Sequence, residues 1–318
     1  MSKIVAIVGP TAAGKTEVAI ELSKQLSLEI ISADSRQVYK YLNIGTNKPL
    51  GKWSNYNGEI VYLYKGIPYH LVDFLEPDQQ YDAGKFFNDS TWLIKKISNK
   101  GVKPLIVGGT GLYIKTLTDG ISLLPARDQK LREHLMNLAS SYGKDYLFNM
   151  LKQLDPVRAS QVHPNNIHRI IRSIEIILKT GKTFTELIKQ HPPIKNFDIL
   201  LIGLYLNKQQ LVQRVHLRTK WMLQNGMLEE TQELISKGVS EKSPVFSSIG
   251  YNWVIKFLKN EISFETMENM IIKDTLAYIK RQITWFKKDN RINWINCDGL
   301  TLKQITRNVL NIINSNPQ

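Results

Sequence analysis

The chain has 318 residues, of which 42% are apolar and 22% are charged, as is ordinary for a globular protein of one large or two modest domains. It contains no run of 18 apolar residues, and a strand pattern begins almost at the N-terminus, so we expect neither a membrane span nor a signal peptide. The single cysteine, Cys297, excludes an internal disulfide and a cysteine metal cluster, and it favours a cytoplasmic protein.

The net charge of +14 is spread unevenly, with +3 over residues 1–120, +6 over 121–196 and +5 over 197–318. An excess of this size indicates a polyanionic partner, of which nucleic acid is the usual one. The alternative is a basic protein whose charges are only solvated.

Residues 9–16 read GPTAAGKT, which fits the phosphate-binding pattern G-x-x-x-x-G-K-[ST]. An apolar run at 4–8 precedes the motif and a helical pattern from Glu17 follows it, so the motif has the strand–turn–helix context that it needs. Backbone N–H groups and the helix N-terminus then point at one phosphate group. We expect a phosphate compound to bind Gly9, Pro10, Thr11, Ala12, Ala13, Gly14, Lys15 and Thr16, with Lys15 on the terminal phosphates and Thr16 on Mg²⁺. The pattern does not identify the compound, and a chance match is the alternative.

Predicted strands and helices alternate through residues 1–118. Strands are expected at 3–8, 29–32, 69–73 and 104–107, and helices at 17–25 and 83–98. This alternation predicts an α/β fold, a P-loop parallel sheet flanked by helices, whose ligands bind at the carboxyl ends of the strands. Asp34 follows the second strand and is a candidate to accept a proton or to hydrogen-bond a substrate, although a helix N-cap or a turn aspartate is an equal alternative.

The pattern turns helical and more basic at 120–182, which predicts an inserted all-helical subdomain between two parts of the core, 1–119 and 183–318. An apolar strand is expected at 197–206. The rest of the chain is predicted to be a helical C-terminal part, with breaks near Gly226, Gly238, Pro244 and Gly250.

Two helices carry arginine and lysine in notable positions. In the helix at 208–224, Arg218 falls within an apolar stripe, so it needs an anionic partner, either a structural acid or a bound diphosphate. In the helix at 273–288, Lys280 and Arg281 belong to a basic arc beside the apolar stripe, and Trp285 projects on the other side. That arc indicates either a nucleic-acid phosphate track or a solvated face.

Together these segments resemble the tRNA dimethylallyltransferase family, also called tRNA isopentenyltransferases. The matching pieces follow the family order over nearly the whole chain: GPTAAGKT at 9–16, SADSRQVY at 32–39, IGTNKP at 44–49, HLVD at 70–73, VGGTGLY at 107–113, DP at 155–156, VHPNN at 162–166, HRIIRSIE at 168–175 and KRQITWF at 280–286. The chain stops without the cysteine/histidine zinc extension of eukaryotic relatives, so a bacterial-type enzyme is expected. We also expect a monomer.

The resemblance implies transfer of a dimethylallyl group from dimethylallyl diphosphate to N6 of the adenosine 3′-adjacent to the tRNA anticodon, position 37. It implies that Asp34 is the general base, that Thr16 and Arg218 steady the leaving diphosphate, and that Mg²⁺ is the cofactor. It also implies that the insertion contacts the anticodon stem-loop. The implied tRNA contacts are Asp34, Ser35, Arg36, Gln37, Thr110, Arg132, His168, Arg169, Arg172, Lys280, Arg281, Gln282 and Trp285.

Three rival functions share some of these features. A P-loop kinase acting on a small molecule uses the same loop for ATP, but it has no need of a basic helical insertion. An isopentenyltransferase acting on free adenine nucleotides is a second rival, and a non-catalytic RNA-binding protein with a vestigial loop is a third. The tRNA-type motifs disfavour the enzyme that acts on free nucleotides. The intact Lys15, Thr16 and Asp34 disfavour the non-catalytic RNA-binding protein. Whether the loop also binds ATP is left open by the sequence.

Overall fold

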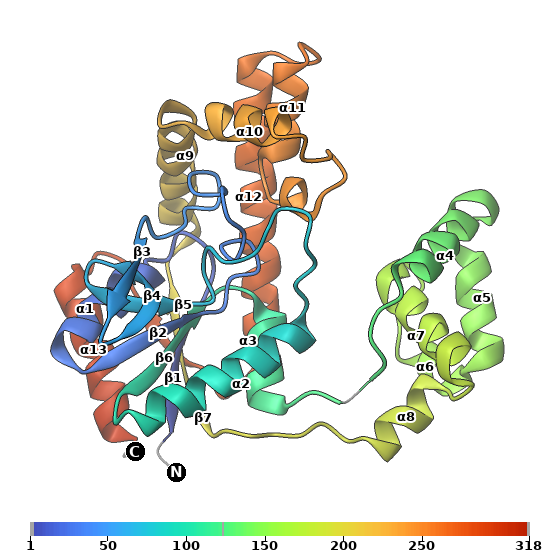
Figure 1. The fold of residues 1–318 in the computed structure, drawn as a ribbon, viewed down its shortest axis with the longest axis horizontal. Coiled ribbons are helices and arrows are strands. Elements are labelled where there is room, and N and C mark those ends of the chain that lie inside the picture. The colour runs from blue at the N-terminus through green and yellow to red at the C-terminus, as the bar shows by residue number, and fades with distance from the viewer. Residues whose placement is uncertain (1–2, 123, 317–318) are drawn as a thin grey trace. The chain divides into compact units, whose positions relative to one another are not determined.

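The computed structural model describes residues 3–122 and 124–316, and the chain divides into two compact units. The first comprises Met1–Thr118 and Asn196–Gln318, and the second comprises Asp119–Lys195. Figure 1 shows the first unit as a sheet flanked by helices and the second as helices alone. Among the described helices, none combines the length and the apolar character that a membrane crossing requires.

The sheet of the first unit has the strand order β3-β4-β5-β2-β6-β1-β7-β8. Its parallel strands are β1 (Ile4–Val8), β2 (Leu28–Ser32), β5 (Ile67–His70), β6 (Lys103–Gly108), β7 (Ile199–Tyr205) and β8 (Asn293–Asn296). The central strands are buried on both faces, which explains their continuous apolar runs. The predicted P-loop α/β class is therefore correct.

Two antiparallel strands extend the sheet at one edge, and the sequence analysis did not predict them. They are β3 (Lys52–Tyr56) and β4 (Glu59–Tyr64), joined through Asn57 and Gly58 at φ 52° and 84°. Lys65 and Gly66, at φ 52° and 79°, make a second tight turn into β5. Two consecutive left-handed residues are typical of the turns that close two-residue hairpins.

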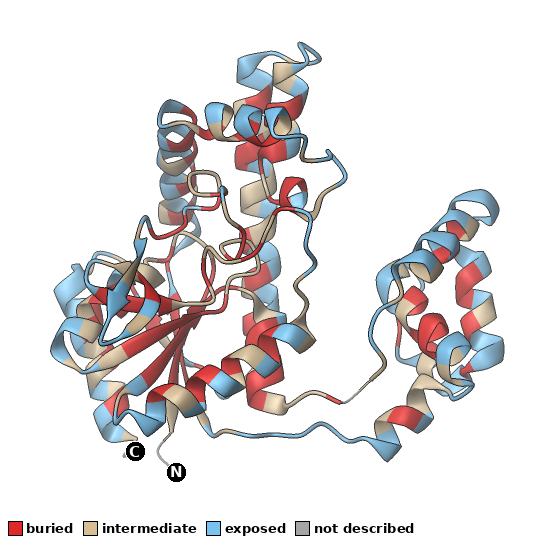
Figure 2. Ribbon diagram, in the orientation of Figure 1, coloured by how far each residue is buried: buried red, intermediate tan, exposed pale blue. Residues whose placement is uncertain are grey.

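Helices cover both faces of the sheet. α1 (Lys15–Gln25) and α2 (Ala83–Asn99) follow strands that step across the sheet in opposite directions, so right-handed crossovers put the two helices on opposite faces. α13 (Leu302–Ser315) packs beside α1, and α3 (Gly111–Asp119) follows β6 (Figure 1). Figure 2 shows the red, buried strands between these helices. Because β2, β6 and β1 are adjacent and parallel, their carboxyl ends lie at the same edge of the sheet.

The C-terminal part of the first unit forms a second apolar core around Met222, Met227, Phe246, Tyr251 and Met267. Its elements are α9 (Lys208–Gln224), α10 (Met227–Ser236), the short helix η1 (Pro244–Ser247), α11 (Tyr251–Leu258) and α12 (Phe264–Phe286). α12 is long enough to reach both cores, with Ile271 in this one and Ile279 in the core of the sheet. The prediction that this part is entirely helical was wrong at β8, which pairs with β7.

The second unit consists of α4 (Gln129–Tyr142), α5 (Lys144–Leu154), α6 (Pro156–Ser160), α7 (Ile167–Thr180) and α8 (Phe184–Gln190). It extends to Lys195, beyond the predicted end at 182, because α8 belongs to it. Buried Asp155 accepts hydrogen bonds from Arg158 N at 2.9 Å and from the Thr185 hydroxyl at 2.9 Å, so its carboxylate joins α6 to α8. The Arg158 guanidinium also stacks 3.8 Å from the centre of the Phe184 ring.

Candidate active site

The phosphate loop lies between β1 and α1, as the motif predicts. Gly9 has φ 139°, and a Cβ there would lie 2.3 Å from the Leu204 carbonyl oxygen, so only glycine fits. Ala12 and Gly14 also have positive φ, 65° and 86°, which turns the loop around the start of α1. The Lys15 ammonium donates to the Pro10 carbonyl oxygen at 2.7 Å. This hydrogen bond holds the Lys15 ammonium against the backbone of the loop.

Lys15 and Arg218 bring two cations to this loop. Burial lowers the pKa of Lys15 to about 8, against the attraction of Asp34, which raises it. Burial also lowers the pKa of Arg218, and its Nη1 donates to the Thr11 hydroxyl at 2.8 Å. Within residues 3–122 and 124–316 no carboxylate pairs with Arg218, so the structural acid that the sequence left open is not its partner. Both cations would stabilise the charge of an anion bound at this loop.

Gln282 of α12 braces the loop from the other side. Its Oε1 accepts from Thr11 N at 2.8 Å and its Nε2 donates to Gly109 O at 2.9 Å. The side chain is buried, and both ends of its amide are engaged by the backbone. The structure therefore gives Gln282 a bracing position, and its implied contact with tRNA remains a prediction. Arg214 adds a bond to Ala12 O at 3.1 Å.

Asp34 follows β2, and it both caps a turn and lines the cavity, the two alternatives that the sequence left open. Its Oδ1 accepts from the backbone N–H groups of Arg36 at 2.8 Å and Gln37 at 3.3 Å, as a turn-capping aspartate does. The same carboxylate lines the cavity above the phosphate loop. In the described part of the chain Oδ2 has no hydrogen bond, so one oxygen is available to a ligand.

The cavity encloses about 630 Å³ at the carboxyl ends of the strands. Its polar lining brings together the phosphate loop, Glu17, Asp34, Gln37, Thr46, Asn47, Arg214 and Arg218. An apolar side is made by Leu217, Trp221, Leu300, Leu302 and Ile305. A hydrogen bond joins the side chains of Tyr69 and Thr16, and burial raises the pKa of Tyr69. A diphosphate bearing a short apolar group matches this lining in size and polarity.

The predicted contacts around Asp34 also fasten one another. Ser35 N donates to Thr110 Oγ1 at 3.0 Å, and Arg36 Nη1 donates to Pro244 O at 3.1 Å and to Ser247 Oγ at 2.9 Å. These bonds connect the end of β2 to the loop before α3 and to η1. They fix the backbone that carries Asp34.

The remaining predicted tRNA contacts divide into exposed and engaged side chains. Lys280, Arg281 and Trp285 are exposed on α12, and a Cβ at Gly111 would lie 2.3 Å from Trp285 Cδ1, so the indole rests on the start of α3. The two positions engaged in ion pairs, Arg132 and Arg172, lie in the second unit.

In the second unit, His168 and Arg169 are exposed at the start of α7, whereas Arg172 and Arg132 surround the fully buried Glu175. Arg172 Nη1 lies 2.9 Å and Arg132 Nη1 3.8 Å from Glu175 Oε2. Arg172 also donates to Pro125 O at 2.7 Å. Both arginines neutralise a buried carboxylate, a role that the sequence analysis did not foresee, because charge spacing alone does not identify a buried partner.

The fold and the site define a P-loop-type α/β protein with a cationic cradle opposite a carboxylate. The chain matches the family model for IPP transferase over residues 37–289, and the model for isopentenyl transferase over residues 2–63. It is 37% identical over 312 residues to the tRNA dimethylallyltransferase of Carboxydothermus hydrogenoformans, covering 97% of this chain and 96% of that protein. It is 39% identical to that of Finegoldia magna, covering 92% and 91%.

Solved structures agree with these matches. The tRNA isopentenylpyrophosphate transferase of Staphylococcus epidermidis aligns with a TM-score of 0.69 at 33% identity, covering 99% of each chain. A eukaryotic dimethylallyltransferase acting on tRNA aligns with a TM-score of 0.80 at 26% identity, covering 100% of this chain and 81% of that one. The chain belongs to the tRNA dimethylallyltransferase family, as its motifs indicate.

Proposed function

We propose that this enzyme transfers a dimethylallyl group from dimethylallyl diphosphate to N6 of the adenosine at position 37 of tRNA. The observation that carries the proposal is that the phosphate loop, Arg218 and Asp34 line the same cavity. Catalysis of this kind needs a leaving-group site and a proton acceptor on either side of the reacting carbon. The family membership supports the same reaction.

In the proposed reaction the N6 lone pair attacks C1 of the dimethylallyl group. The bond between C1 and the bridging oxygen breaks, its electron pair leaves with the diphosphate, and the N6 proton passes to Asp34 Oδ2. Lys15, Arg218 and the loop N–H groups stabilise the charge that builds on the diphosphate. The amine becomes more acidic as the new bond forms, so a carboxylate is a strong enough base.

Magnesium fits this site through oxygen ligands. The Thr16 hydroxyl lines the cavity, and the described residues contain no cluster of three acidic, histidine or cysteine side chains that would hold a metal alone. Mg²⁺ usually keeps several waters and binds through one or two protein oxygens and substrate phosphates. Thr16 would be the residue that holds Mg²⁺, and the ion would supply charge neutralisation for the leaving group.

The tRNA is proposed to contact exposed polar side chains of both units, His168 and Arg169 on α7 and Lys280 and Arg281 on α12. Phosphate contacts of this kind position the RNA without reading its bases. The target adenine has to leave its stack to reach Asp34, which takes a few kcal/mol that protein contacts must offset. Asp34 and Gln37 line the cavity and are the candidates for base contact.

The test is to incubate the protein with dimethylallyl diphosphate and unmodified tRNA, and to analyse the nucleosides by mass spectrometry. The proposal predicts N6-isopentenyladenosine from position 37 and no product from free AMP. A parallel incubation with labelled ATP and small-molecule acceptors tests the kinase alternative. Phosphoryl transfer without prenyl transfer would contradict the proposal.

A further inference from the structure

The loop at residues 43–48 forms one wall of the active-site cavity. Thr46 and Asn47 line the cavity beside Gln37, and Gln37 Nε2 donates to the carbonyl oxygens of Thr46 at 3.4 Å and Asn47 at 3.1 Å. Gln37 N in turn donates to Asp34 Oδ1. Gln37 therefore links this loop to the carboxylate of the proposed base, through its side chain on one side and its backbone N–H on the other.

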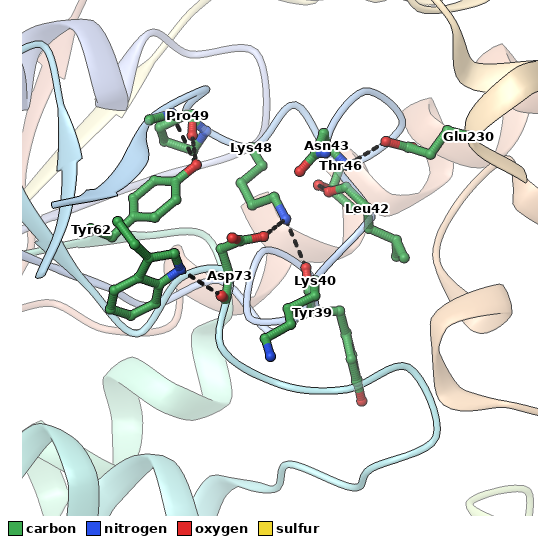
Figure 3. A network of polar contacts seen from close by, with 12 residues as sticks. Tyr39, Lys40, Leu42, Asn43, Thr46, Lys48, Pro49, Tyr62, Asp73 and Glu230 are labelled. Carbon is green, nitrogen blue, oxygen red and sulfur yellow. Dashed lines mark hydrogen bonds and ion pairs between the residues drawn. The ribbon is translucent and has the colours of Figure 1, made fainter. Parts of the chain in front are cut away.

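One side chain from far along the sequence holds the start of the loop. Glu230 of α10 accepts from Asn43 N at 2.5 Å and Ile44 N at 2.8 Å through Oε2, and from Gly45 N at 3.2 Å through Oε1. The Tyr251 hydroxyl adds a fourth donor to Oε1 at 2.5 Å. Figure 3 shows Glu230 reaching toward Asn43. Four donors converge on one carboxylate, which is the arrangement that stabilises a charged acceptor most strongly.

The close approach of Tyr251 restricts the path of this loop. A Cβ at Gly45 would lie 2.6 Å from the Tyr251 hydroxyl oxygen, so residue 45 has to be glycine while Tyr251 bonds to Glu230. Asn47 has φ 50°, a left-handed conformation that asparagine tolerates better than most residues. The loop closes on itself through Lys48 N to Asn43 O at 3.0 Å.

A buried ion pair holds the end of the loop. The Lys48 ammonium is fully buried and contacts the Asp73 carboxylate and Tyr39 O, the latter at 2.8 Å (Figure 3). Burial lowers the pKa of Lys48, and the neighbouring Asp73 and Glu230 counter this shift. Trp53 Nε1 donates to the backbone carbonyl oxygen of Asp73 at 3.2 Å, which holds the residue that pairs with Lys48. The loop is thus fastened at both ends by groups outside it.

We propose that Glu230 is a positioning residue for transfer, which acts by holding residues 43–45 so that Gln37 and Asp34 meet the adenine in the reactive geometry. This proposal rests on the proposed function. Glu230 does not line the cavity, so its effect has to pass through the backbone of the loop. A displacement of about 1 Å in a positioning group lowers a rate by up to about 100-fold.

The test is Glu230→Gln, with Glu229→Gln as the matched control. Glu229 is the exposed neighbour on α10 and undergoes the same change of charge. A glutamine at 230 turns an NH₂ group toward N–H donors, so we expect residues 43–45 to lose their anchor. For Glu230→Gln we expect kcat per folded molecule to fall about 10- to 100-fold, while KM for dimethylallyl diphosphate and Kd for tRNA change less than about threefold.

Hydrogen exchange provides a readout that does not depend on activity. The amides of Asn43, Ile44 and Gly45 should exchange faster in Glu230→Gln than in the wild type or in Glu229→Gln, because their acceptor is weakened. Unchanged kcat in folded Glu230→Gln would overturn the proposal, and so would unchanged exchange at these three amides. An inactive wild type would contradict the proposed function, whereas the exchange measurement would still decide whether Glu230 holds the loop.

Tyr251→Phe keeps the test informative if Glu230→Gln fails to fold. It removes one of the four donors and leaves the carboxylate in place. We expect a smaller loss of kcat, about threefold to tenfold, with faster exchange at Gly45, whose N–H shares Oε1 with Tyr251. Normal kcat and normal exchange in this variant would overturn the proposal.

Discussion

Replacing Gln282 by leucine should loosen the phosphate loop and leave the tRNA-binding surface intact. The substitution removes the acceptor of Thr11 N–H and the donor to Gly109 O, while leucine fills a similar volume. A buried backbone group without a partner destabilises a fold by about 1–3 kcal/mol. The Gly109 bond is buried and the Thr11 bond only partly so. Together they predict a loss of about 2–4 kcal/mol in the free energy of unfolding.

The assay combines urea unfolding with titrations of diphosphate and of tRNA. Since Thr11 also holds Arg218, the freed loop should weaken binding of inorganic diphosphate by about tenfold or more, equivalent to about 1.4 kcal/mol. The control is Arg281→Ala, a change at the exposed residue next to Gln282 on α12. It should leave the free energy of unfolding and the affinity for diphosphate unchanged and weaken tRNA binding. Normal stability and normal diphosphate affinity in Gln282→Leu, with weakened tRNA binding, would refute the bracing role.

Three further predictions follow from the site and the second unit. Asp34→Asn should lower single-turnover transfer roughly 10²–10⁴-fold with tRNA affinity nearly unchanged, and near-normal turnover would remove Asp34 from the mechanism. Arg172→Ala should destabilise the protein by about 3 kcal/mol, because it leaves the buried Glu175 with only the more distant Arg132 as a cation. Arg169→Ala should lower the slope of log K for tRNA binding against log salt by about 0.9 and leave the melting temperature unchanged. Equal behaviour of the two variants would contradict this division. Since the pKa of Lys15 is about 8, diphosphate affinity should fall as pH rises through 8 and Lys15 loses its charge, and a constant Kd from pH 7 to pH 9 by calorimetry would refute this.

Local pattern was enough to predict the core of the fold. The central strands, α1, α2 and α9 occur where apolar periodicity predicts them, because burial against the sheet enforces that pattern. The edge hairpin was missed although Asn57-Gly58 is a strong turn signal, since β3 is largely exposed and neither β3 nor β4 alternates between apolar and polar residues. The strand predicted at 69–73 ends at His70, because Leu71 and Asp73 adopt φ 57° and 55°.

The site was predictable as a set of residues but not as a set of contacts. Arg218 donates to Thr11 of the loop, whereas its place in an apolar stripe predicted only that it needs an anionic partner. The bracing bonds of Gln282 and the bonds from residues 43–45 to Glu230 join residues more than 170 positions apart, and no local spacing signals such a contact. Arg172 appeared in a basic motif, yet it pairs with a buried glutamate, because burial of Glu175 depends on the packing of α4, α5 and α7.

The most direct test of the central claim is a crystal structure of the protein with an anticodon stem-loop and an unreactive thio-analogue of dimethylallyl diphosphate. The account predicts the diphosphate in the loop at 9–16 in contact with Lys15 and Arg218, and N6 of the target adenosine about 2.6–3.2 Å from the Asp34 carboxylate. A diphosphate bound outside this loop, or an adenine N6 that does not reach Asp34, would contradict it.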